Sequence, residues 1–513
     1  MIRFLNQKHS IYYIILFNFL LRLVIVLTTN LGNDEVYYVN YALYPDLSYF
    51  DHPPFVGYLI RLTTFNLQLL HPDFFVRLGS LLIGSFNLYL IYRIGCFLKN
   101  TFTANLAALL LSCSLYSTII VGTFILPDTP LSVFWLLALY FFLKYISSDD
   151  SKWLLWFGVT TGFALLSKYQ AVFLWIGAIS YLFLFDRKKF ISPRLYMALG
   201  ISFLLFTPVL WWNFNSPFSG IAYHESRVGN KDWLPSLDYF FPEFFGQFFY
   251  NNPIAVILII WSLIAFYRLQ KKWSKPMLFL WCCSLPLIVT TLCMSFFNRT
   301  LPHWSGPSYF SLIILCALSI SSLEIVQRKK FISLAYWGHI LLTLLIALGI
   351  FQVTTGYLLP SNPENSLKTG KNDFTVDIAL WPEISAVLAK EIPSTNTSTF
   401  IITSNWFPAS HIDYYYAQQH NIPLYVVGGT NNKHQYAMIN EEKGMISKGS
   451  TGYYMTTSHS YRPLPKSLTP LFTQIEDPTI LPVVKNGKIR LYIHLYTLNS
   501  LLADWNPNSP LTE

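Results

Sequence analysis

Charged residues are scarce in this sequence of 513 residues. Asp, Glu, Lys and Arg make up 12% of the chain, whereas hydrophobic residues make up 53% and aromatic residues 18%. An ordinary soluble domain contains about 25% charged residues, so this composition argues against a soluble protein. The net charge of +9 would suit a nucleic-acid partner, but the basic residues gather in short clusters between apolar runs. That distribution is a signal of membrane topology. We therefore predict a polytopic α-helical membrane protein with no nucleic-acid partner.

Three further features are missing. The six cysteines all lie in or beside apolar segments and residues 353–513 contain none, which excludes a disulfide framework there. The first apolar run is long and lacks a small-residue cleavage site, so we expect a retained helix and no cleaved signal peptide. We also find no internal repeat or low-complexity tract.

Apolar segments of roughly membrane-spanning length dominate the first 352 residues. There are eleven, at about 11–29, 74–92, 103–122, 129–146, 153–167, 170–185, 195–212, 253–268, 277–297, 305–322 and 333–352. Alternate connections between them carry 17 and 6 Lys or Arg residues. The positive-inside rule then puts the N-terminus in the cytoplasm. We expect a multi-pass protein of the cell inner membrane whose residues after about 353 are extracytoplasmic.

Two domains are predicted. Residues 1–352 would form a transmembrane domain, and residues 353–513 a small extracytoplasmic α/β domain. In the second domain, "TFIITSN", "IPLYVVGG", "TGYYMTTS" and "IRLYIHLYTL" are typical of strands, while "WPEISAVLAKEI" and "HIDYYYAQQH" are typical of helices. The outer connections of the first domain are candidates for catalytic loops, at about 30–73, 123–129, 213–252 and 298–305.

Acidic residues are concentrated in these outer connections. Asp34 and Glu35 follow the first apolar segment, and Asp128 lies in "FILPDTPL". Ordinary explanations are a solvated loop, a helix cap or a Pro-Asp turn. The first loop, however, also contains further polar and aromatic candidates, which are Tyr37, Tyr38, Asp51 and His52.

Basic residues occur on the same predicted face. They are Lys168, Arg227, Arg299 and His303. Each can be explained as a side chain that anchors its helix at the membrane surface. Carboxylates and cations in one plane also suit a reaction in which a hydroxyl loses a proton and a phosphate leaves.

The stretch "NDEVYYVNYALYPDLSYFDHPPFVGYLIRLTT" resembles the first extracytoplasmic loop of glycosyltransferase family 39 and its bacterial relatives. These relatives include protein O-mannosyltransferases and the aminoarabinose transferases that modify lipid A, and they share the GT-C architecture. The similarity continues through "HPDFFVRLGSLLIG", "LPDTPLSVFWLLALYFFLKY", "GFALLSKYQAVFL", "TPVLWWNFNSPFSGIAYHESRV" and "LPHWSGPSYFSL". It covers most of residues 20–320.

The resemblance implies transfer of a hexosyl or pentosyl group from a polyprenyl-phosphate donor to a hydroxyl of lipid A, a protein or another glycan, with inversion. It implies that Asp34 is the general base, that Glu35 orients the acceptor and that Asp128 organises the site. Four residues would bind the donor phosphate: Lys168, Arg299, His303 and Arg227. Four others would contact substrate: Tyr37, Tyr38, Asp51 and His52.

The subgroup and the metal are left open. Aminoarabinose transferases usually have Lys before the paired prolines, where this chain has His52. Asp51, His52 and Asp128 are also candidate ligands of a divalent cation, although their spacing specifies no metal.

Two other functions remain as alternatives. A transporter or flippase of a lipid-linked or amphipathic substrate would carry ionisable groups near the bilayer midplane and often a two-fold repeat of spans. The other alternative is a receptor that uses its C-terminal domain as a binding module. In such a receptor, Asp34 and Asp128 would have no shared function.

Overall fold

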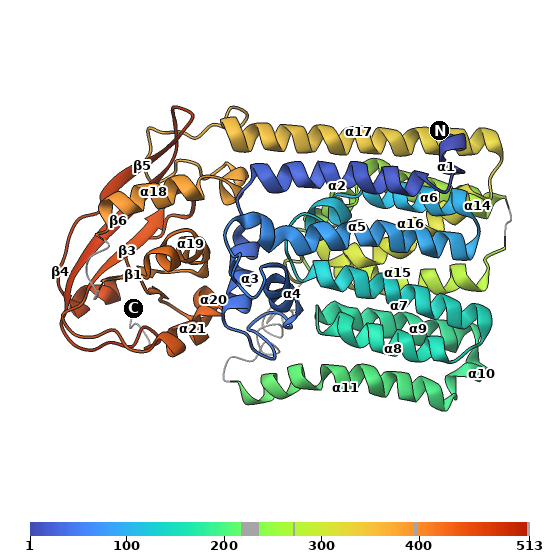
Figure 1. Ribbon diagram of the computed structural model, residues 1–513, viewed down its shortest axis with the longest axis horizontal. Coiled ribbons are helices and arrows are strands. Elements are labelled where there is room, and N and C mark those ends of the chain that lie inside the picture. The colour runs from blue at the N-terminus through green and yellow to red at the C-terminus, as the bar shows by residue number, and fades with distance from the viewer. Residues whose placement is uncertain (217–234, 270–271, 394–398, 510–513) are drawn as a thin grey trace. The chain divides into compact units, whose positions relative to one another are not determined.

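The computed structural model describes residues 1–216, 235–269, 272–393 and 399–509 (Figure 1). The chain forms two compact units, Met1–Val26 with Asp46–Leu345 and Leu27–Pro45 with Ile346–Glu513. The segment 27–45, which the sequence analysis assigned to the membrane domain, groups by its contacts with the C-terminal residues. The reason is that its helix α3 (Asn33–Leu43) packs against α19 (Trp406–Ile412).

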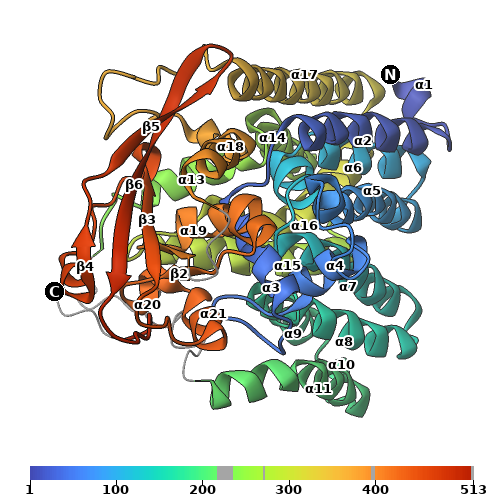
Figure 2. The same ribbon diagram turned by 60° about the vertical axis from the view of Figure 1, so that its left-hand side comes forward.

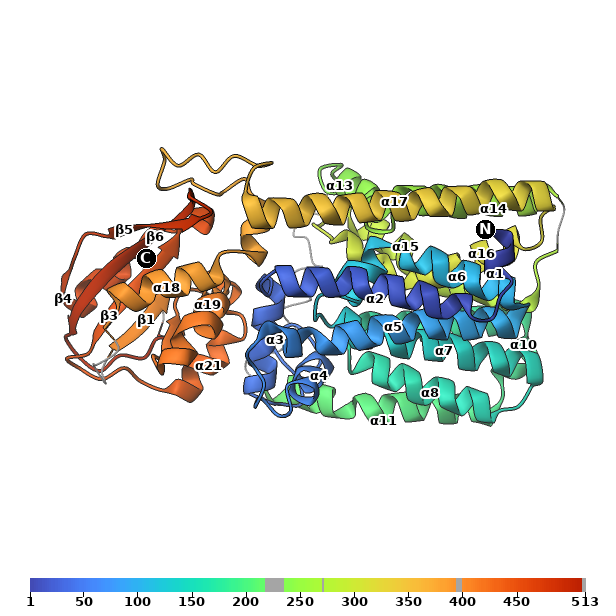
Figure 3. The ribbon, with the colours of Figure 1, turned by 45° about the horizontal axis from the view of Figure 1, so that its top comes forward.

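The first unit is helical, and its longer helices run side by side (Figure 3). Each of the eleven predicted segments coincides with helix in the structure. In chain order these helices are α2 (Ser10–Thr28), α5 (Asp73–Leu98), α6 (Thr101–Ser112) with η1 (Tyr116–Val121), α7 (Asp128–Ser148), α8 (Lys152–Leu165), α9 (Val172–Phe185), α11 (Pro193–Asn215), α14 (Pro253–Arg268), α15 (Lys275–Met294), α16 (Gly306–Ile320) and α17 (Ile325–Thr355). A short helix, α1 (Ile2–Leu5), precedes them, and shorter elements connect them, namely α4 (Phe55–Thr63), η2 (Tyr169–Ala171), α10 (Arg187–Phe190), α13 (Phe240–Tyr250) and η3 (Pro302–Ser305).

Six of the described helices are long and apolar enough to cross a membrane, namely α2, α5, α7, α11, α15 and α17. A seventh span results if α13 and α14, which meet at a bend of 89°, are taken together. The prediction of a multi-pass membrane protein is thereby confirmed.

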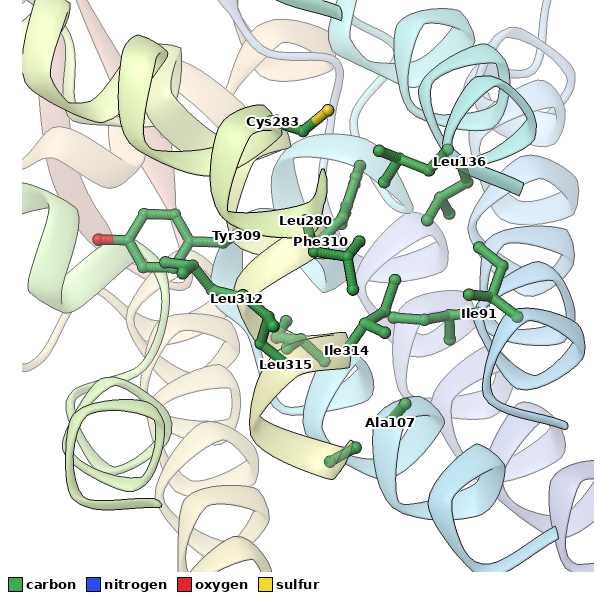
Figure 4. Close-up of a cluster of buried hydrophobic side chains, with 14 of the residues drawn as sticks. Ile91, Ala107, Leu136, Leu280, Cys283, Tyr309, Phe310, Leu312, Ile314 and Leu315 are labelled. Carbon is green, nitrogen blue, oxygen red and sulfur yellow. The ribbon is translucent and has the colours of Figure 1, made fainter. Parts of the chain in front are cut away.

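Helix α16 lies inside the first unit, and all of its residues are buried. Figure 4 shows Phe310 and Leu315 of α16 among side chains of neighbouring helices, such as Leu136 of α7 and Leu280 of α15. A helix that is apolar on all sides is typical of such a central position. Its N-terminal end is fixed by this packing, which matters for the residues that precede it.

The second unit contains a mixed six-stranded sheet in the order β2-β1-β3-β6-β4, in which β5 also pairs with β6. The strands are β1 (Thr399–Thr403), β2 (Leu424–Val426), β3 (Thr451–Thr457), β4 (Phe472–Ile475), β5 (Thr479–Lys485) and β6 (Lys488–Leu501). Strand β1 is parallel to β2 and β3, whereas β6 is antiparallel to β3, β4 and β5. Four of these strands were predicted from the sequence; β4 and β5 were not.

Figure 2 shows helices α18 (Trp381–Glu391) and α19 beside the sheet of the second unit. The other helical elements after residue 373 are η4 (Phe374–Ile378), η5 (Asp413–Ala417), η6 (Gln418–His420), α20 (Thr430–Lys433), α21 (Tyr436–Lys443), η7 (Ser458–Ser460) and η8 (Lys466–Leu471). The predicted helices at 381–392 and 411–420 are confirmed, the second as π- and 3-10-helical turns that continue α19.

Candidate active site

The predicted site residues fall into both units. Six of them belong to the first unit, namely Asp51, His52, Asp128, Lys168, Arg299 and His303, and four to the second, namely Asp34, Glu35, Tyr37 and Tyr38. Arg227 lies outside the described residues.

Asp128 and Lys168 form a buried ion pair in the first unit. Asp128 is the first residue of α7, and Lys168 directly precedes η2. The Lys168 Nζ atom lies 2.7 Å from Asp128 Oδ2, and the two side chains are 5% and 2% exposed. Burying a charge at this depth is costly unless a partner compensates for the lost water. Each of these two residues therefore compensates the buried charge of the other.

Tyr116 is a further partner of Asp128 and was not among the residues selected from the sequence. Its hydroxyl donates a hydrogen bond of 3.0 Å to Asp128 Oδ1. The ring of Tyr116 lies directly over Gly306, where a Cβ atom would overlap with it. Gly306 belongs to the motif "LPHWSGPSYFSL", so the glycine provides the space that directs Tyr116 toward Asp128. A phenol inside the predicted membrane segment 103–122 was the available signal.

His303 lies on η3, immediately before α16. Burial and the nearby Lys168 ammonium lower the pKa of His303 to about 4, while Asp128 acts in the opposite direction. The imidazole is therefore neutral near pH 7 and offers a hydrogen bond instead of a charge. Arg299, in the same connection, is exposed.

Asp51 and His52 are on the loop before α4. The backbone N–H of Phe55 donates to the carbonyl of Leu166 at 3.2 Å, which ties this loop to the chain that leads to Lys168. Asp51 interacts electrostatically with Tyr169. Within the described ranges, however, no group of three or more His, Cys, Asp or Glu side chains is arranged to hold a metal ion. Asp51, His52 and Asp128 therefore do not form the cation site considered above.

Asp34 and Glu35 occupy the first turn of α3 in the second unit, and their environments differ. Glu35 is 1% exposed, and its Oε2 accepts a hydrogen bond of 2.8 Å from the Gly32 N–H, so it caps its own helix. Asp34 is exposed. The N-terminal end of a helix favours an ionised carboxylate, which suits Asp34 as a proton acceptor.

Asp377 of η4 is a third carboxyl group in this region, and the sequence analysis missed it. Burial and the charges of Asp34 and Glu35 raise the pKa of Asp377 to about 7, although hydrogen bonds from Asn33 act in the opposite direction. Nothing in the sequence connects residue 377 with residue 34, so only the fold could reveal this neighbour.

Tyr37 and Tyr38 are buried within the second unit, with exposed fractions of 2% and 5%. The Tyr37 hydroxyl accepts a hydrogen bond of 3.3 Å from the Gln435 N–H, and its ring lies 5.1 Å from that of Trp406. Both tyrosines therefore contribute to the packing of α3.

Comparison with known proteins gives one family match. Residues 51–212 match the model of the dolichyl-phosphate-mannose-protein mannosyltransferase family. This segment is less than half of the chain, and it contains Asp51, Tyr116, Asp128 and Lys168. No curated protein matches the chain.

Solved structures give a broader match. The crystal structure of ArnT from Cupriavidus metallidurans bound to undecaprenyl phosphate is 14% identical to this chain, with a TM-score of 0.65 over 95% of this chain and 98% of that chain. The chain has the GT-C fold. The apo state of the same ArnT matches over 94% and 97% with a TM-score of 0.62 and 14% identity. The oligosaccharyltransferase AglB from Archaeoglobus fulgidus, in complex with an inhibitory peptide and a dolichol-phosphate, is 12% identical, with a TM-score of 0.50 over 87% of this chain and 69% of that chain.

These findings confirm the predicted fold class. The family match also supports the resemblance that the loop motifs indicated, and together with the fold it favours a glycosyltransferase over a transporter.

Proposed function

We propose that this protein transfers a sugar from a polyprenyl-phosphate donor to a hydroxyl group of an acceptor on the extracytoplasmic side of the cell inner membrane. The observation that carries the proposal is the buried Asp128–Lys168 pair, because both partners lie inside the segment that matches the mannosyltransferase family. ArnT was solved with undecaprenyl phosphate and AglB with a dolichol-phosphate, which supports a lipid-linked donor.

In the proposed reaction the acceptor oxygen attacks the anomeric carbon of the sugar, and the bond from that carbon to the phosphate oxygen breaks. Asp34 takes the proton of the acceptor hydroxyl as general base. The polyprenyl phosphate leaves with the bonding electrons, and attack from the opposite side inverts the anomeric centre. The sugar is a hexose or a pentose, and the acceptor is lipid A, a protein or another glycan.

The departing phosphate requires donors that are already in place. Lys168 has three N–H donors, and Asp128 engages one of them among the described residues. We assign the phosphate to Lys168, with a hydrogen bond from neutral His303 and a surface charge from Arg299. Asp51 and His52, on the loop tied to this region, are assigned to substrate.

The test is turnover of a panel of radiolabelled polyprenyl-phosphate sugars by the purified protein in lipid nanodiscs, with envelope extracts as acceptors. We expect one donor to be consumed, and Asp34→Asn to lower kcat by about 10²- to 10⁴-fold. Asp477→Asn is the matched control, because Asp477 is an exposed carboxylate of the same unit in the turn between β4 and β5. Failure of every donor, while the lipid still binds, would favour the transporter.

A further inference from the structure

The backbone just before Asp34 is held by residues from the C-terminal part of the same unit. The Leu31 N–H donates to the Tyr415 hydroxyl at 2.8 Å, and His411 Nε2 lies 2.9 Å from the Leu31 carbonyl oxygen. The preceding Asn30 N–H donates to the carbonyl of Ile378 at 2.8 Å. Three backbone hydrogen-bonding groups of Asn30 and Leu31 are thus fixed by residues about 350 to 385 positions away in the sequence.

His411 is well suited to this contact because its ring has one defined state. The side chain is fully buried, and its ring stacks on that of Trp381 with 3.8 Å between centroids and 9° between planes. Burial lowers the pKa of His411 to about 3, against the opposing effect of the Leu31 and Asp377 carbonyls. The neutral ring has one N–H, and a carbonyl oxygen can only accept. The hydrogen bond to the Leu31 carbonyl therefore requires the proton on Nε2.

The stacked residues also hold η4. The Trp381 Nε1–H donates to the Asp377 carbonyl at 3.0 Å. Trp381, His411 and Tyr415 have nearly parallel rings, with interplanar angles of 9° and 12° between successive members. The same stack therefore supports both Leu31 and the segment that carries Asp377.

Helix α3 needs such support. It has 11 residues, and helices shorter than about 12 to 15 residues are marginal in isolation. Asp34 belongs to the first turn of α3, so the place of its carboxylate depends on where the helix begins and on its direction. Leu31 comes immediately before the N-cap residue Gly32. Holding Leu31 therefore sets the start and direction of the helix.

We propose that His411 and Tyr415 are positioning residues for Asp34, and that this is a catalytic purpose of the C-terminal residues. The proposal rests on the proposed function, in which Asp34 is the general base. His411 and Tyr415 act through the Leu31 backbone and touch no reacting atom. Their loss displaces the base, and a misplacement of about 1 Å can cost about 10²-fold in rate.

The experiment combines hydrogen exchange with kinetics on the full-length protein in lipid nanodiscs. Amide exchange is followed in peptides that cover residues 27–45, and kcat and KM are measured for the donor. The variants are His411→Leu, which removes the ring donor, Tyr415→Phe, which removes only a hydroxyl, and His411→Gln, whose amide N–H can still reach a carbonyl.

Two matched controls remove similar groups elsewhere in the unit. His494 is equally buried, and its Nε2 lies 2.8 Å from the Ser366 carbonyl oxygen. Tyr416 is adjacent to Tyr415 in sequence and donates to the Leu388 carbonyl at 3.4 Å. His494→Leu and Tyr416→Phe should leave exchange in residues 27–45 and kcat within about 3-fold of wild type.

We expect His411→Leu to accelerate exchange in residues 27–45 at least about 10-fold and to lower kcat about 10- to 100-fold, with KM for the donor within about 3-fold. Tyr415→Phe should act in the same direction with a smaller effect, and His411→Gln should recover part of kcat. Unchanged exchange, or faster exchange with an unchanged kcat, would overturn the proposal. So would a loss that appears only in KM.

One further variant separates this proposal from the proposed function. Asp34→Asn should lower kcat by about 10²- to 10⁴-fold without changing exchange, because the backbone contacts remain. If the wild type consumes no donor, the proposed function fails, while the exchange comparison still decides whether His411 and Tyr415 hold this backbone.

Discussion

Among the described residues, each unit contains one ion pair in which both side chains are at most 5% exposed. In the second unit, Arg490 Nη2 lies 2.8 Å from Asp373 Oδ2, with both side chains 1% exposed. In the first unit, the Asp128–Lys168 pair has a separation of 2.7 Å and is almost as buried. Removing charges from water is costly, so both pairs must be compensated by their surroundings.

The pairs differ in how many hydrogen bonds the carboxylate of each pair accepts from the surrounding residues. Asp373 also accepts hydrogen bonds from the Thr375 N–H at 3.0 Å, the Thr375 hydroxyl at 2.6 Å and Gln352 Nε2 at 2.8 Å. Asp128 has Tyr116 as its additional partner among the described residues. The Asp373 carboxylate, with its additional partners, has the character of a structural support. The Asp128–Lys168 pair has fewer partners among the described residues and retains donors that can serve a substrate.

The largest effect on stability is expected from breaking the Asp373–Arg490 pair. Arg490→Met leaves the Asp373 carboxylate buried without a cation and should lower the free energy of unfolding by about 3–5 kcal/mol. The double variant Asp373→Asn/Arg490→Met removes both charges and should recover most of that loss. Thermal unfolding followed by tryptophan fluorescence measures both. A double variant as unstable as the single one would contradict this account.

The next prediction tests whether the Asp128–Lys168 pair serves sugar transfer. The double variant Asp128→Asn/Lys168→Met should stay folded, within about 1–2 kcal/mol of wild type, because no lone charge remains buried. Its sugar transfer should fall about 10²- to 10³-fold, since the phosphate loses its positioned donor. The double variant at Asp373 and Arg490 is the control and should keep its turnover. Equal turnover in the two double variants would remove the distinction between the pairs.

Arg22 of α2 is another buried cation, and its hydrogen-bond partners among the described residues are neutral groups. Its guanidinium donates to the carbonyls of Asn18, Leu81 and Gly122 and to the Ser85 hydroxyl, at 2.8–3.2 Å. Lysine cannot reproduce this planar set of donors.

Arg22→Lys should therefore lower the free energy of unfolding by about 2 kcal/mol and leave KM for the donor unchanged. Arg93→Lys is the matched control, because Arg93 is exposed and donates to one hydroxyl, that of Tyr89. An altered KM in Arg22→Lys would instead indicate contact with the lipid phosphate.

The last prediction concerns the pH dependence of stability and Asp377, a carboxyl placed near other carboxylates. Its pKa is about 7 in the folded protein and about 3.9 in an unfolded chain. The folded state binds a proton that the unfolded state lacks between these values, so this contribution to stability is lost as the pH rises from about 4 to about 7. Asp377→Asn should flatten this part of the pH profile of unfolding, and Asp477→Asn should not. An unchanged slope in Asp377→Asn would contradict the assignment.

The sequence predicts features that depend on residues close together in the chain better than features that depend on residues far apart in it. The apolar runs located all eleven helical segments, because a membrane span is a local property of about 20 residues. The loop motifs selected Asp128 and Lys168, which are 40 residues apart, but did not show that they pair. Tyr116, Asp377 and His411 were missed because their roles depend on neighbours in space. The sequence left a helix cap as one of several explanations for Glu35, and the fold shows that Glu35 caps α3.

The sequence by itself determined the membrane class, the helical segments, the C-terminal sheet and the residues among which a site should be sought. Hydropathy and strand patterns are formed by neighbouring residues of the chain, so they can be recognised without knowledge of the fold. Only the tertiary structure decided which buried carboxylate accepts more hydrogen bonds, which residue caps α3 and which side chains hold Leu31. Hydrogen bonds act over about 3 Å and depend on direction, so the partners of a buried group are defined only once distant segments are brought together.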